Sequence, residues 1–176
     1  RRIETAAMDL WRDQGFDAVS VDTIVGRAGV SKGAFFIFFR TKAEALGVYA
    51  EVLSERMAAV REGLDPARPL SSLDAFAVAA EAVLAGEGDL GRTLYRELGG
   101  RAFTELRRDD VAAFTAFVEA AQAAGGLDPD MDPAVAGELI ADVWTSGLLD
   151  WASRGGDDLA ARMRPRLRLL VCGLGA

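Results

Sequence analysis

Residues 30–42, VSKGAFFIFFRTK, combine two kinds of side chain that bind very different partners. Four phenylalanines and one isoleucine fill the five positions 35–39, and the cations Lys32, Arg40 and Lys42 frame them. Lysine and arginine bind anionic groups such as phosphates. A run of aromatic side chains either packs into a core or forms an apolar contact surface. The helical spacing of the five residues therefore decides which of them remain free for contacts.

The composition argues against catalysis and against metal binding. The chain contains no histidine and only one cysteine, Cys172. The commonest general base and the commonest metal ligand are thus missing. No serine or cysteine motif of the nucleophilic type occurs, so an acid–base site would rest on carboxylates alone. We expect no metal, no cofactor and no enzymatic activity.

Charge is distributed unevenly along the 176 residues, whose net charge is −7. Residues 1–47 carry seven Lys/Arg and six Asp/Glu, whereas residues 48–176 carry thirteen and twenty-one. A relatively basic first quarter on an acidic body is compatible with local contact to a polyanion. No apolar run is long enough to span a membrane, no signal-peptide pattern is visible, and a lone cysteine fits a reducing compartment. We expect a cytoplasmic protein without a membrane contact.

Two short helices positioned around a glycine turn would present the stretch 30–42. Ser20 is a predicted N-cap for a helix over 21–28, and Ser31 is one for a helix over 32–38. Gly29, Val30 and Ser31 join them, which is the pattern of a helix-turn-helix. In such a motif the second helix can enter a DNA major groove while the first crosses the backbone.

Apolar spacing is helical nearly everywhere, so the predicted fold class is all-α with about nine helices. The first helix ends at Gly15, expected in the left-handed conformation. Thr41 is a predicted cap for a fourth helix over 42–62. Further helices are expected from Ser71 or Ser72 to Leu84, around 94–98, over 104–124, over 133–153, and up to Leu174. We predict a helix-turn-helix domain over 1–46 and a ligand-binding and dimerisation domain over 47–176.

Residues 6–46 resemble the N-terminal DNA-binding domain of the tetracycline-repressor (TetR) family. The resemblance rests on Gly15-Phe16, Ser20-Val21, Ile24, the AGVSKG turn at 28–33, Phe39, Lys42 and Leu46. It implies a cytoplasmic homodimer that binds a pseudo-palindromic operator in double-stranded DNA and is released by a small molecule bound to the C-terminal domain. The family usually has a tyrosine at Phe36, whose hydroxyl binds a phosphate, and often a histidine at Phe38.

The five apolar residues of the stretch divide between the two faces of the second helix. Phe35, Phe38 and Phe39 are spaced to form one inward stripe, and Phe36 and Ile37 are expected on the contact surface. Lys32 is the best candidate for a polar base contact, because lysine donates to guanine O6 and N7. The predicted DNA-binding residues are Ser20, Thr23, Ser31, Lys32, Gly33, Ala34, Phe36, Ile37, Thr41 and Lys42.

The C-terminal body supplies two further predicted surfaces. The last two helices have long apolar faces, and in the resembled family such helices pair with their copies in a dimer. The predicted dimer interface comprises Leu139, Val143, Gly147, Met163, Leu167 and Leu170. Aromatic residues from different helices are expected to line a largely apolar ligand cavity. They are Phe76, Tyr95, Phe103, Phe114, Phe117 and Trp144.

Two other classes of function remain open from the sequence alone. One is an enzyme that uses only carboxylates. The other is a helical small-molecule-binding or interaction module that has lost specific DNA recognition, since the usual tyrosine and histidine are missing. Binding to random DNA and its dependence on salt would begin to separate these classes.

Overall fold

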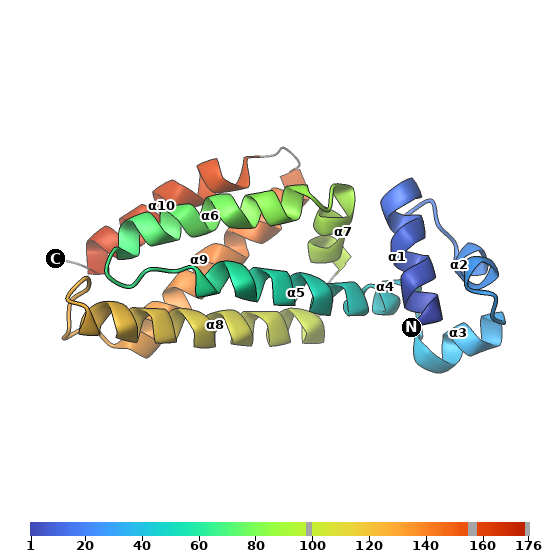
Figure 1. Cartoon of the computed structure of the whole chain (residues 1–176), viewed down its shortest axis with the longest axis horizontal. Coiled ribbons are helices and arrows are strands. Elements are labelled where there is room, and N and C mark those ends of the chain that lie inside the picture. The colour runs from blue at the N-terminus through green and yellow to red at the C-terminus, as the bar shows by residue number, and fades with distance from the viewer. Residues whose placement is uncertain (98–99, 155–157, 175–176) are drawn as a thin grey trace.

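The computed structural model describes residues 1–97, 100–154 and 158–174, with the side chains of residues 100–103, 105 and 174 outside the description. The described residues form α-helices and no strands, as the sequence predicts. A three-helix unit lies at one end of an elongated helical body, and α4 and α5 connect the two (Figure 1). The helices are α1 (Arg2–Gln14), α2 (Val21–Ala28), α3 (Lys32–Phe38), α4 (Lys42–Ala45), α5 (Gly47–Glu62), α6 (Pro69–Ala85), α7 (Asp89–Glu97), α8 (Gly100–Ala123), α9 (Pro133–Arg154) and α10 (Leu159–Leu174).

Side-chain caps define the N-terminal unit as predicted. Ser20 and Ser31 each accept a hydrogen bond from the backbone N–H three residues later, at 3.1 Å in both cases. Gly29 ends α2 in the left-handed conformation, with φ +63° and ψ 42°. Gly15 also has a positive φ of +83°, but its ψ of 156° takes the chain out of the left-handed helical region that we expected. Both positions favour glycine because a Cβ disfavours positive φ.

The predicted single helix over 42–62 is wrong, because the chain breaks at Leu46. Leu46 N donates to Ala43 O, and Tyr49 N donates to Leu46 O, each at 3.0 Å. These are the tighter i→i+3 bonds of a 3₁₀-like turn rather than α-helical ones. Gly47 follows, and glycine is a poor helix former. The break lies at the predicted domain boundary between residues 46 and 47, although the division into two domains stays a prediction.

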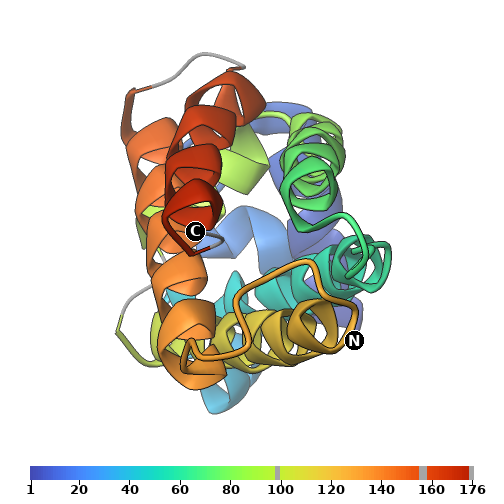
Figure 2. The same cartoon turned by 90° about the vertical axis from the view of Figure 1, so that its left-hand side faces the viewer.

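Helices α6, α8, α9 and α10 pack around the core of the C-terminal body. Figure 2, viewed along the body, shows α9 and α10 next to each other on one side and α5 and α8 next to each other below α6. Two glycines of α9 allow close helix contacts. A Cβ on Gly137 would collide with Thr115 of α8, and a Cβ on Gly147 would collide with Met163 of α10.

We predict that Phe35 and Phe38 contribute very differently to folding although both lie on α3. Phe35 has an exposed fraction of 0% and Phe38 one of 69%. Phe35→Ala should lower the free energy of unfolding by about 3–5 kcal/mol through the loss of a buried ring. Phe38→Ala should change it by less than about 0.5 kcal/mol. Chemical denaturation of both variants checks this, and equal losses would contradict the assignment.

Candidate nucleic-acid interface and interior cavities

The exposed face of α3 is apolar at its C-terminal end. Phe36 and Ile37 are 48% and 79% exposed, as expected for a contact surface. Phe38 is also exposed, which corrects the predicted inward stripe of Phe35, Phe38 and Phe39. The cause is the end of the helix: Phe39 adopts an extended backbone, with φ −134° and ψ 125°. Phe39 therefore packs half-buried against the core, and Phe38 remains outside it.

Lys32 begins α3 and forms an exposed ion pair across the turn. Its Nζ lies 2.9 Å from Asp22 Oδ2. Exposed pairs of this kind contribute only about 0.2–1 kcal/mol, so DNA can compete for the ammonium at little cost. Next to it, a Cβ on Gly33 would meet only Ser31 Oγ, at 3.8 Å. Nothing within the chain requires glycine there, and its lack of a side chain leaves the surface open to close approach.

Lys42 forms hydrogen bonds inside the protein that could not be predicted from the sequence. Lys42 Nζ donates to the carbonyl oxygens of Phe16 and Val19, at 2.7 and 3.0 Å. The ammonium also lies 4.2 Å from the centre of the Phe16 ring. It thereby ties the start of α4 to the loop between α1 and α2. These two bonds leave one of the three donors of the ammonium, so the predicted phosphate contact of Lys42 stays a prediction beside this structural role.

The remaining predicted contact residues lie at helix starts. Thr41 accepts from Glu44 N at 3.0 Å, as Ser20 and Ser31 accept from Thr23 N and Ala34 N. As acceptors in these caps, Ser31 and Thr41 keep their own hydroxyl proton available for a phosphate oxygen. Ser20 Oγ lies 2.8 Å from Thr23 Oγ1, so these two hydroxyls bond to each other. These polar groups lie at the starts of α2, α3 and α4, on the elements that precede and follow the exposed apolar residues of α3.

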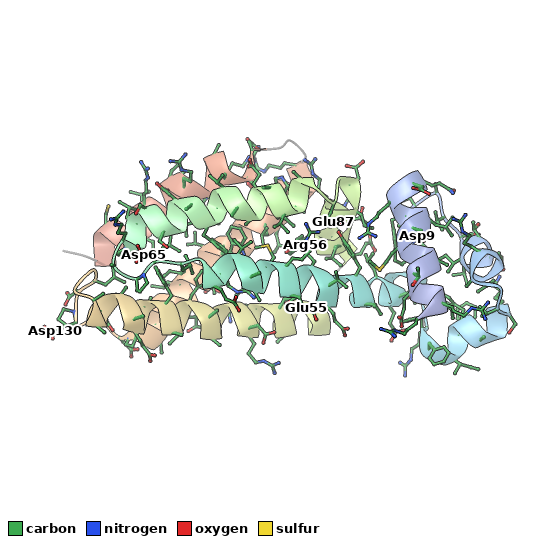
Figure 3. The ribbon with its side chains drawn as sticks, in the orientation of Figure 1. Asp9, Glu55, Arg56, Asp65, Glu87 and Asp130 are labelled. Carbon is green, nitrogen blue, oxygen red and sulfur yellow. The ribbon has the colours of Figure 1, made fainter. Side chains whose placement is uncertain are left out.

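A buried carboxylate joins the three-helix unit to the body. The side chain of Glu87, in the turn between α6 and α7, is 7% exposed. It pairs with Arg56 of α5, and Arg12 Nη2 of α1 lies 3.4 Å from Glu87 Oε2. Figure 3 shows Glu87 and Arg56 at the end of the body that faces α1. Burial alone would raise the pKa of Glu87, but the neighbouring Tyr49 hydroxyl and both arginines hold it below its usual value.

Most of the aromatic residues predicted to line a ligand cavity pack into the core in this structure. Phe76 lies 5.6 Å from Phe114 and 4.6 Å from Trp144 between ring centres. Phe76, Phe114 and Phe117 are buried but line neither of the cavities below. Tyr95 and Trp144 line a cavity of only about 30 Å³, enough for roughly one or two waters. The side chain of Phe103 lies outside the described residues.

A buried ion pair lines that small cavity. Arg61 Nη1 lies 2.6 Å from Asp110 Oδ1, and the two side chains are only 11% and 12% exposed. Burial raises the pKa of Asp110 to about 6, while the Arg61 guanidinium acts in the opposite direction. The short distance between the two groups makes this carboxyl the direct partner of the Arg61 guanidinium.

The predicted dimer interface must be redrawn. Met163 and Leu167 have exposed fractions of 0%, because they pack inside the subunit. Gly147 lies against Met163 of the same chain, so its close approach is internal. Val143 and Leu170 are half-buried, and only Leu139 of the predicted set is 41% exposed. Among the described residues, the other large apolar side chains exposed on α9 and α10 are Val135, Leu149 and Leu169.

Two features of the described residues concern metal binding and membrane insertion. No group of three or more potential metal-ligating side chains occurs among them. In the same part of the chain no single helix is long and apolar enough to cross a membrane. Helices α6 and α7 reach the necessary length and hydropathy only when they are taken together, and the chain bends by 101° between them.

The fold and its exposed α3 face define a helix-turn-helix regulator with an all-helical C-terminal domain. Residues 3–46 match the family model of bacterial regulatory proteins of the tetR family. The whole chain is similar to FadR from Thermus thermophilus, a TetR-family transcriptional repressor solved in complex with lauroyl-CoA. That structure is 28% identical with a TM-score of 0.76, and the match covers 99% of this chain and 94% of the other. Residues 3–46 are therefore similar to the DNA-binding domain of TetR-family regulators, and the whole chain shares the fold of a TetR-family repressor.

Two more distant structures share the fold. SmeT, the repressor of the Stenotrophomonas maltophilia multidrug efflux pump SmeDEF, has 20% identity and a TM-score of 0.73, with 98% of this chain and 88% of SmeT covered. FadR from Bacillus subtilis, solved with stearoyl-CoA, has 21% identity and a TM-score of 0.68, with 98% of each chain covered. No curated protein matches the sequence.

Substitution of Lys32 should affect DNA recognition, whereas substitution of Lys42 should affect folding. Lys32→Ala should cost about 1–3 kcal/mol on a specific duplex and relax the preference at one base pair. Lys42→Ala should instead lower the free energy of unfolding by about 1.5–3 kcal/mol, because it removes charged hydrogen bonds to two carbonyls. Each variant is the control for the other in melting and DNA-titration experiments. A stable Lys42→Ala protein whose salt slope falls by about one phosphate contact would contradict the structural role and support the predicted phosphate contact.

Proposed function

We propose that the chain is a cytoplasmic transcriptional repressor that binds its operator as a homodimer and leaves it when a small molecule binds the C-terminal domain. The observation that carries the proposal is the exposed contact face of α3. This face combines Lys32 and Gly33 with Phe36 and Ile37, of which the last is 79% exposed. Apolar side chains at such positions can contact thymine methyl groups, and lysine can donate to guanine.

Selection of bound sequences from a random DNA pool tests the proposal. A two-fold dimer presents two copies of α3, so the selected sites should contain two inverted half-sites. Their centres should lie about one helical turn apart, roughly 34–36 Å, or a multiple of it. Recovery of no preferred sequence would instead favour a binding module that has lost DNA recognition. Recovery of single asymmetric sites would contradict the dimeric arrangement.

The apolar side chains left exposed on α9 and α10 support a dimer through these helices. Leu139 and Leu169 are 41% and 78% exposed, and burying them against a second copy would remove apolar surface from water. The double variant Leu139→Glu/Leu169→Glu should therefore sediment as a folded monomer. Val78→Glu is the control, because Val78 is 50% exposed but lies on α6. A double variant that stays dimeric would place the interface elsewhere.

Glu87 is suited to transmit ligand binding to the DNA-binding unit, because it holds Arg12 of α1 and Arg56 of α5 together. Glu87→Gln should weaken this link and reduce the fold-release of operator DNA by ligand, within the usual coupling range of about 1–3 kcal/mol. The matched control is Asp74→Asn. Asp74 also holds two arginines, Arg164 and Arg168, but both belong to α10.

Operator affinity of both variants would be titrated with and without ligand. Equal release in wild type and Glu87→Gln would contradict a coupling role for this carboxylate. A matching loss in Asp74→Asn would attribute the effect to general destabilisation instead.

A further inference from the structure

A groove lies between the α4–α5 segment and the N-terminal part of α8, next to the three-helix unit. Its volume is about 1120 Å³, which is much larger than the small inner cavity. Phe38 and Phe39, at the end of α3, line one end of it. Helices α5 and α8 run side by side along this region (Figures 1 and 2).

The floor of the groove is apolar and continues into the interior. Ala50, Leu94 and Leu106 line both the groove and the inner cavity. Leu46 and Val48 add further apolar surface near the three-helix unit. A ligand with an apolar tail could therefore lie along the groove and point toward the inner cavity.

The cations that reach these cavities are already neutralised. Arg61 pairs with Asp110. Arg107 donates from Nε to Asp142 Oδ1 at 2.9 Å, and its Nη2 lies 3.2 Å from Glu138 Oε1. Neither guanidinium is therefore left as an uncompensated charge for an anionic ligand.

In contrast to these cations, three carboxylates that line the groove have no partner of opposite charge among the described residues. Among the described residues, Glu51, Glu55 and Glu97 form neither an ion pair nor a side-chain hydrogen bond, although all three line the groove. Glu44 accepts a hydrogen bond from the Arg40 backbone, and Asp109 lies 3.7 Å from Arg108. The groove thus combines an apolar floor, two phenylalanine rings at one end and uncompensated negative charge along its rim.

We propose that this groove binds a small cationic amphiphile, meaning an ammonium group attached to an apolar body. The carboxylates of Glu51, Glu55 and Glu97 attract the ammonium, and Phe38 and Phe39 supply aromatic rings in the same lining, whose faces attract cations. The apolar body covers Ala50, Leu94 and Leu106. This inference rests on the proposed function and names the class of its releasing ligand. The same carboxylates would repel a polyanionic ligand such as an acyl-CoA.

Calorimetric titration of the full chain with amphiphiles of one tail length tests the proposal. The probes are dodecyltrimethylammonium and dodecyl sulfate, both below their micelle concentrations, and lauroyl-CoA. We expect the cation to bind at least about tenfold more tightly than either anion, and its affinity to fall as salt rises, since exposed charges are screened. Equal or tighter binding of the anions would overturn the proposal, and this test needs no variant.

Matched variants locate the site. Glu51→Gln/Glu55→Gln should weaken the cation about tenfold and leave the melting temperature near that of wild type, because both side chains are exposed. Glu119→Gln/Asp130→Asn removes the same charge from exposed residues that line neither cavity. Figure 3 shows Glu55 near α8 and Asp130 beyond its far end. If both double variants lost the same affinity for the cation, the effect would come from net charge alone, and the proposed site would be wrong.

The remaining outcomes separate this inference from the proposed function. If lauroyl-CoA releases operator DNA while the cation fails to bind, the repressor stands and the ligand class is wrong. If the cation binds as expected but no duplex is ever bound, the groove stands and the repressor is wrong. Tighter binding of an oligolysine peptide than of the amphiphile would make the groove a protein-docking surface and overturn the small-molecule assignment.

Discussion

The carboxylate of Glu87 is the interaction on which the relative position of the two halves of the molecule depends. It is almost fully buried, and its two arginine partners come from α1 and α5. Each arginine is 44% exposed, so only the carboxylate is removed from water. If α1 moved away from the turn before α7, this carboxylate would lose one of its two cationic partners, which is unfavourable for a largely buried charge. This constraint favours a few discrete domain arrangements over continuous drift, which is what a switch between two states requires.

Local features of this fold could be predicted from the sequence with good accuracy. Ser20, Ser31 and Thr41 each cap a helix through a backbone N–H only three residues away, so donor and acceptor lie in one short window. Gly29 similarly ends α2 through its own backbone conformation. The all-α class follows from apolar periodicity, and the motif between residues 20 and 42 follows from these caps. Such features depend on neighbours along the chain and not on the tertiary structure.

The features that could not be predicted depend on residues far apart in the sequence. Lys42 is held by carbonyls of Phe16 and Val19, more than twenty positions earlier. Leu167 has the same apolar spacing whether it faces a second copy or its own core, and only the packing of α10 against α6 and α9 decides between them. Phe38 was misplaced for a related reason: its periodicity assumes that α3 continues, whereas the chain turns to an extended conformation at Phe39.

The exposed ring of Phe38 connects the two proposed binding surfaces. A large apolar side chain that is 69% exposed adds little to the core, yet it lies beside Ile37 of the proposed DNA-contact face and also lines the groove. If the proposed DNA-contact face needs Phe38 in another position, a ligand that packs against this ring would oppose DNA binding. Ligand and operator would then favour different arrangements of the same residue. By linkage each would weaken the other, whichever binds first, and the effect would add to any motion transmitted through Glu87.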